Sequence, residues 1–155
     1  MERKNIGIEA ALQKIRQYCA YQERNHREVK EKLYSFGLNK HDVEELISRM
    51  IEENYLNEER YALMYAGGKF RVKNWGKVKI RYELKLKGIS NYCIEKALAA
   101  IDDSDYEATL DKLFSEKLLS LKKEKNIFTR KRKIRDFLLQ KGFENGLIAG
   151  LIHKI

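Results

Sequence analysis

Proline is absent from the 155 residues of this chain, and cysteine and histidine are scarce. Because proline is the strongest helix breaker, its absence leaves long helical stretches uninterrupted. Cys19 and Cys93 are too few for a disulfide framework, and both fall in apolar helical stripes, so we expect buried free thiols. His26, His41 and His153 are scattered, and no cysteine–histidine spacing suits zinc, so we expect each histidine at the surface.

Long apolar runs and nucleotide-binding loops are also missing. No apolar run approaches the roughly 20 residues that cross a bilayer, and no signal peptide opens the chain, so we expect a cytoplasmic protein without a membrane partner. The Gly67-Gly68-Lys69 segment is no P-loop, because the earlier glycine of that loop would stand at Leu63. No serine or cysteine has a base nearby in the sequence. We therefore expect no enzymatic activity, cofactor or metal site.

What the chain has instead is a pattern that occurs three times. Each copy places one glycine between two apolar stripes, and these glycines are Gly37, Gly88 and Gly142, which lie 51 and 54 residues apart. Apolar residues stand eight and four residues before each glycine, and six, ten and thirteen residues after it. Both sets of offsets place the apolar side chains on one face of a helix.

Glycine between two helices is the usual residue where the chain turns through a left-handed conformation. Each copy therefore predicts a helix, a glycine stop and a second helix, and a further apolar stripe before each copy predicts a third helix. The expected N-caps are Asn39, Asn57 and Ser90. Gly67 and Gly68 lie inside the helix expected over 56–72, and each lowers its stability by about 1 kcal/mol relative to alanine. The pair can therefore kink or split this helix.

The sequence thus predicts an all-α fold, an elongated array of three tandem three-helix (helix-turn-helix-like) repeats. The three repeats are expected at residues 1–55, 56–101 and 102–155. No segment has the period-two alternation of a strand. A unit of about 50 residues buries little apolar surface alone, so we expect neighbouring units to share helix contacts within a monomer.

The net charge of +9 is distributed unevenly over these repeats. The first repeat is neutral, whereas the second carries +6 and the third +3. The excess is concentrated in residues 69–87 and 122–135, each with eight basic residues against one glutamate. Such stretches are the electrostatic footprint of a polyanion partner, although a solvated helix face gives the same pattern.

Basic residues of the second and third repeats make up a candidate nucleic-acid surface. Lys77, Arg81 and Lys85 are four apart and predict one exposed stripe, which the third repeat copies in part. The full candidate set is Lys69, Arg71, Lys73, Lys77, Arg81, Lys85, Arg130, Lys131, Arg132 and Arg135. Trp75 and Tyr82 beside the stripe can stack on bases, but we expect both to pack in the core.

Several segments of the middle repeat carry a family resemblance. They are residues 55–62 (YLNEERYA), 75–77 (WGK), 80–84 (IRYEL) and 87–89 (KGI). Together they resemble the RecX family of bacterial recombination regulators, whose signature is a GYLDD.RFA segment followed by G..KI..EL...GI. The first repeat adds ERNHREV and KL, similar to the family's R..S..EL..KL. Asn54 and Asn57 depart from the usual glycine and aspartate.

The resemblance implies tandem three-helix units and a modulator of the RecA recombinase, acting in DNA repair, recombination and the SOS response. Members of the family lie in the helical groove of the RecA–single-stranded DNA filament, and they suppress strand exchange, ATP hydrolysis and coprotease activity. The implied partners are the RecA filament and single-stranded DNA, with duplex DNA as a further possibility. The family has no catalytic residues to carry over to this chain.

Two other classes stay open on the residues alone. A sequence-independent nucleic-acid-binding protein would bind single strands without a recombinase and with a steep salt dependence. A helical adaptor that binds only protein would use its charge for solubility and would not bind DNA at low salt.

Overall fold

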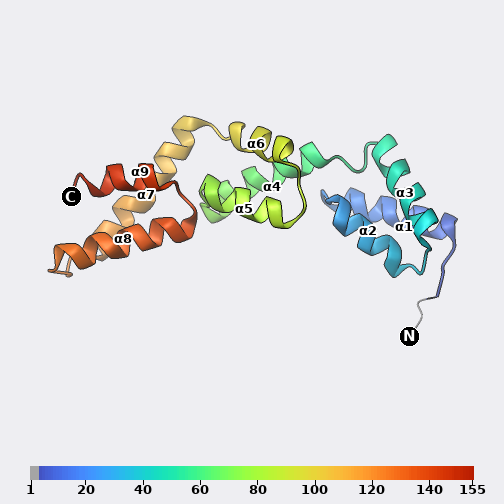
Figure 1. The fold of residues 1–155 in the computed structure, drawn as a ribbon, viewed down its shortest axis with the longest axis horizontal. Helices are drawn as coiled ribbons and strands as arrows, with labels where there is room; N and C mark the ends of the chain where they lie inside the picture. Colours follow the sequence, from blue (N-terminus) through green and yellow to red (C-terminus); the bar gives the residue numbers. More distant parts are fainter. Residues whose placement is uncertain (1–3) are drawn as a thin grey trace.

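The structure, a computed structural model, describes residues 4–155, and that range holds nine α-helices and no strand. The helices are α1 (Ile8–Tyr21), α2 (His26–Ser35), α3 (Lys40–Glu52), α4 (Glu58–Lys73), α5 (Lys77–Leu86), α6 (Asn91–Ala99), α7 (Asp103–Ser120), α8 (Ile127–Lys141) and α9 (Asn145–Ile152). They follow one another as three groups of three along the long axis of the molecule, with the two termini at opposite ends (Figure 1). The predicted all-α, elongated array is confirmed.

The repeated glycines end the second helix of each group. Gly37, Gly88 and Gly142 have φ angles of +82°, +81° and +95°, the left-handed region that glycine enters at little cost. Asn54, between α3 and α4, also has a positive φ, of +63°. Asparagine tolerates this conformation better than most residues with a side chain. Asn54 can therefore stand where the family signature named above has glycine.

Side-chain caps begin most of the helices. The oxygens of Asn39, Asn57 and Ser90 accept hydrogen bonds from backbone N–H groups three residues further on, so these three predicted caps are confirmed. Asn25, which the sequence analysis did not single out, forms a full capping box with Glu28 at the start of α2. The helix starts are thus fixed locally by the sequence.

Helix α4 runs unbroken through Gly67 and Gly68, so the pair neither splits it nor marks its end. Its buried residues are Tyr61, Ala62, Ala66 and Phe70. This face packs along α6, and the burial outweighs the roughly 2 kcal/mol that two glycines cost in a helix.

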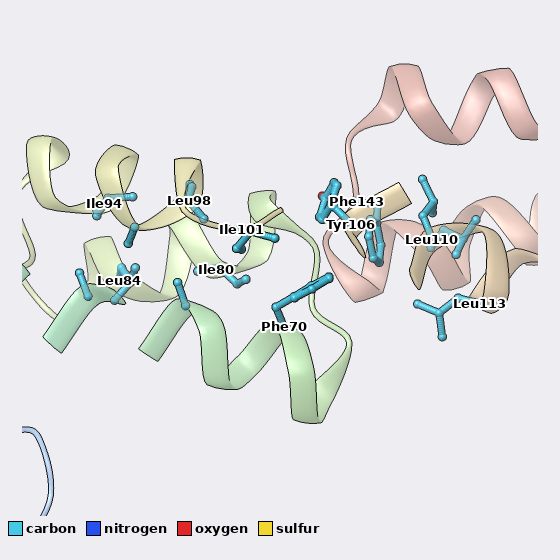
Figure 2. Packing of buried hydrophobic residues seen from close by; sticks show 14 of the residues in the cluster. Phe70, Ile80, Leu84, Ile94, Leu98, Ile101, Tyr106, Leu110, Leu113 and Phe143 are labelled. Carbon is cyan, nitrogen blue, oxygen red and sulfur yellow. The ribbon is translucent and has the colours of Figure 1, made fainter. Parts of the chain in front are cut away.

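Two separate hydrophobic clusters form the core. The first lies within α1–α3 and their turns, around residues such as Ile15, Val29 and Met50. The second is shared by α4–α9, where Phe70, Tyr106 and Phe143 meet at the contact between the second and third groups (Figure 2). The second and third repeats therefore share helix contacts as expected, whereas the apolar core of the first repeat is separate from theirs.

Candidate nucleic-acid interface

The stripe on α5 consists of three basic residues in different environments. Lys85 is exposed, but Lys77 and Arg81 are half-buried. The Arg81 guanidinium forms two hydrogen bonds to Glu95 of α6, with Nε–Oε1 and Nη2–Oε2 distances of 2.8 and 3.2 Å. This pairing raises the pKa of Arg81 and lowers that of Glu95. The prediction of one exposed stripe is wrong for Lys77 and Arg81, which are half-buried, and α6 supplies a carboxylate that pairs with the central charge of the three.

Lys77 is tied to the contact between the second and third groups. Its backbone N–H donates to the Tyr106 hydroxyl at 2.9 Å, and its Nζ lies 4.9 Å from the centre of the Tyr106 ring. The same hydroxyl donates to the carboxylate of Glu144. Burial, followed by this hydrogen bond, raises the pKa of Tyr106. The Tyr106 hydroxyl of α7 therefore joins the start of α5, through Lys77, to the start of α9, through Glu144.

The α4 candidates lie on two faces of that helix. Arg71 is exposed on the face that carries Gly67, where its guanidinium occupies the space left by the missing side chain. Lys73 is exposed at the end of the helix, and its carbonyl accepts a hydrogen bond from Lys141 Nζ at 3.3 Å. Lys69, four residues before Lys73 and so on the same side of the helix, lies above the rings of Tyr65 and Trp75. The structure therefore does not gather the three into one α4 surface.

The α8 candidates are likewise unequal. Arg130 is half-buried and donates to the backbone carbonyl of Glu124, so it holds the turn between α7 and α8. Arg132 and Arg135 are exposed and form no ion pair within residues 4–155, and Lys131 is half-buried. Arg132 and Arg135 are the members of this set that remain available to a polyanion.

A row of lysines on aromatic rings was missed by the sequence analysis. Trp75 lies between Lys69 and Lys79, whose Nζ atoms are 5.1 and 4.6 Å from its ring centre. Tyr65 lies between Lys69 and Lys87, at 5.5 and 5.4 Å. We call these five residues the lysine–aromatic row. The sequence analysis named Lys69 and Trp75 but not Tyr65, Lys79 and Lys87, and only the fold brings the two helices α4 and α5 together in this row.

Exposed aromatic residues also depart from expectation. Trp75 packs against the second cluster as predicted, but Tyr82 is 61% exposed on α5, so its expected core role is wrong. Phe128 at the start of α8 is 82% exposed beside the basic turn between α7 and α8. Exposed aromatic rings next to basic residues are typical of surfaces on which nucleic-acid bases stack.

Other chemistry is sparse in the part of the chain that the structure describes. Cys19 and Cys93 are free and buried, and all three histidines are exposed, as predicted. Within residues 4–155, the one group of potential metal ligands is His41, Asp42 and Glu45 on a single helical turn of α3, where His41 and Glu45 are exposed and Asp42 is half-buried. Across residues 4–155, no helix combines the length and apolarity that a membrane crossing requires.

The architecture is that of an elongated helical-repeat protein with basic side chains on its second and third groups. Residues 57–98 match the family model for the second three-helix domain of RecX, and residues 104–152 match the one for the third domain. Together these matches cover more than half of the chain. The chain belongs to the RecX family.

Curated relatives agree with this assignment. The regulatory protein RecX of Clostridium perfringens (strain 13 / Type A) is 32% identical over 133 residues, which are 85% of this chain and 62% of the relative. That of Bacillus cytotoxicus is 30% identical over 144 residues, 93% of this chain and 53% of the relative. The chain thus spans between about half and about two thirds of the length of these relatives.

Two solved structures share the fold. The crystal structure of RecX from Lactobacillus salivarius has a TM-score of 0.84 and 27% identity, with 95% of both chains covered. A second crystal structure, of a regulatory protein RecX, has a TM-score of 0.83 over 96% of this chain and 72% of the other, and at 21% identity it supports the fold alone.

Proposed function

We propose that this protein binds the filament that a RecA-type recombinase forms on single-stranded DNA, occupies the filament groove, and inhibits strand exchange, ATP hydrolysis and coprotease activity. Membership of a family of regulatory proteins named RecX is the observation that carries the proposal. In this role the protein performs no chemistry of its own and acts as a monomer in the cytoplasm.

The distribution of available charge supports a polyanion-facing role for the second and third repeats, proposed at residues 56–101 and 102–155. Lys85, Arg132 and Arg135 are exposed and outside any ion pair within residues 4–155. A phosphate backbone releases its condensed counterions when such cations neutralise it, which drives binding at low salt. Arg81, although a member of the candidate set, contributes less because Glu95 already pairs with it.

The elongated shape supports binding in a groove. The three helix groups lie in a row along one axis (Figure 1), so each group can offer a contact surface of its own. Each surface then needs only modest affinity, because tethered contacts act at a high effective concentration. The proposed first repeat, residues 1–55, has no net charge and is suited to contact protein rather than phosphate along most of its surface.

The proposal is tested by strand exchange with RecA from the same organism, in the presence of increasing amounts of this protein. We expect the yield of exchanged product to fall as the protein approaches the protomer concentration. Unchanged exchange at excess protein, together with salt-dependent binding to free single strands, would instead identify a general nucleic-acid-binding protein. Unchanged exchange without DNA binding at low salt would identify an adaptor that binds only protein.

A further inference from the structure

A pocket of about 420 Å³ lies between the first and second helix groups, where residues of α2 and of the turn that joins α5 to α6 line it. The Arg27 side chain of α2 crosses this junction, and its Nη1 donates to the carbonyl of Leu86, the last residue of α5, at 2.7 Å. Gly88 leaves the room for it, since a Cβ at this position would come within 2.8 Å of Arg27 Nη2. The guanidinium is therefore held in place while its remaining N–H groups stay available.

Positive charge dominates the lining of this pocket. Arg27 and Lys30 come from α2 and Lys87 from the end of α5, and none of the three forms an ion pair within the described residues 4–155. Glu58 is the carboxylate in the lining, and its Oε1 already accepts a hydrogen bond from the backbone N–H of Ser90 at 2.7 Å. The lining thus contains three cationic residues and one carboxylate, and that carboxylate is held by the start of α6.

The pocket is continuous with the lysine–aromatic row through Lys87. The Lys87 Nζ lies 5.4 Å from the ring centre of Tyr65, which is in edge contact with Trp75 at 6.5 Å between centres. Lys69 lies over both rings, with its Nζ 5.5 Å from the centre of Tyr65 and 5.1 Å from that of Trp75, and Lys79 ends the row on Trp75. Cations and aromatic rings therefore alternate from the junction along the second group, the combination with which proteins hold a single strand by its phosphates and bases.

We propose that the junction pocket binds a backbone phosphate of a single-stranded nucleic acid, and that the strand continues from it along the lysine–aromatic row. Arg27 supplies a planar fork of donors and Lys30 and Lys87 supply point charges, a set suited to a phosphate oxyanion. The strand then crosses from the second repeat onto α2, so the first repeat takes part in nucleic-acid binding although its net charge is zero. This inference rests on the proposed function only in taking nucleic acid as the polyanion.

The test measures binding of fluorescently labelled oligothymidylate to the full chain by anisotropy over a range of salt concentrations, without any recombinase. Lys30→Gln combined with Lys87→Gln removes two phosphate contacts and leaves the Arg27 bridge intact. We expect about a tenfold loss of affinity at low salt, and a slope of log affinity against log salt that is shallower by about 1.4, because each contact to a single strand contributes about 0.7. Circular dichroism verifies that the variant is folded.

The matched control is Lys14→Gln combined with Lys112→Gln, two exposed lysines outside the pocket that form no ion pair within residues 4–155 and produce the same change of charge. Equal slopes for the two double variants would overturn the proposal. Binding of polyglutamate is measured in parallel. If the pocket variant loses affinity for polyglutamate but not for the oligonucleotide, the occupant is an acidic protein segment and the proposal is overturned. Because no recombinase is present, failure here leaves the proposed inhibition of strand exchange untouched. In the same way, if the protein does not inhibit strand exchange, the oligonucleotide measurement still tests whether the pocket binds a phosphate.

Discussion

Two glycines let the second and third helix groups approach backbone to backbone. The Gly76 N–H donates to the Lys141 carbonyl at 2.8 Å, and the Val78 N–H donates to the Gly142 carbonyl at 2.9 Å. A Cβ on Gly76 would overlap the carbonyl of Gly142, and a Cβ on Gly142 would overlap the side chain of Lys79. The joint between these groups therefore depends on the absence of side chains at two positions.

Glycine-to-alanine changes at two positions should have opposite effects. Gly76→Ala forces backbone atoms apart and should lower the free energy of unfolding by about 2 kcal/mol or more. Gly68→Ala lies inside α4 with nothing within 4 Å of the new Cβ, and should raise it by about 0.5–1 kcal/mol through better helix propensity. Urea denaturation of both variants measures these values, and a loss of stability in Gly68→Ala would contradict the account of α4.

The buried thiols should be protected from alkylation in the native protein. Burial raises the pKa of Cys19 to about 11, so about one molecule in a thousand carries the thiolate there at pH 8. We expect iodoacetamide to modify Cys19 and Cys93 more than a hundredfold faster in denaturant than in buffer, by mass spectrometry. Labelling of Cys19 in buffer at the rate of an exposed thiol would show that α1 does not pack as described.

Among the features of individual helices, the capping residues were predicted correctly from the sequence. Local hydrogen bonds explain this, because a cap such as Asn39 or Ser90 depends on residues only three positions away. The unbroken course of α4 and the pairing of Arg81 with Glu95 could not be predicted in the same way. Both depend on α6, which packs against α4 and α5 only in the folded chain.

The two hydrophobic clusters should unfold as separate units. Ile15 is fully buried in the cluster of α1–α3, and Ile134 is fully buried in the cluster that α4–α9 share. Removing an isoleucine side chain from a core costs about 2–5 kcal/mol. Ile15→Ala should therefore speed amide hydrogen exchange in α1–α3 alone, whereas Ile134→Ala should speed it throughout α4–α9.

Hydrogen exchange followed by mass spectrometry resolves these two patterns. An even loss of protection over all helices in both variants would show one cooperative unit instead. The shared cluster also means that a chain ending at Ile101 would expose Phe70, which packs on Tyr106 of α7. Deletion of the third repeat therefore disturbs the second, and point substitutions test the contribution of its charges more cleanly.

For the whole molecule, the net charge of each repeat correctly indicated where basic residues are concentrated. It did not indicate which of these side chains are available to bind a polyanion. The sequence predicted a surface on the second and third repeats from net charges of +6 and +3. In the fold, Arg81 is paired, Arg130 holds a turn, and Lys79 and Lys87 join Lys69 on aromatic rings. These differences arise because ion pairs and ring contacts join residues from different helices.

The free charges should carry the salt dependence of nucleic-acid binding. Lys85→Gln, Arg132→Gln and Arg135→Gln together remove three cations that form no ion pair within residues 4–155, and should make the slope of log affinity against log salt shallower by about 2 for single strands. The single change Arg81→Gln should alter this slope by much less, since Glu95 already neutralises that charge. Anisotropy titrations at several salt concentrations measure both, and a larger effect from Arg81→Gln would contradict the ranking.

The proposed inhibition of a RecA-type filament through the basic repeats can be measured by ATP hydrolysis. The measurement is the single-stranded-DNA-dependent ATPase rate of RecA from the same organism, titrated with this protein and with the triple variant at Lys85, Arg132 and Arg135. We predict that the wild-type protein lowers the rate and that the triple variant requires a clearly higher concentration for the same effect. An ATPase rate that stays unchanged at excess wild-type protein would contradict the account.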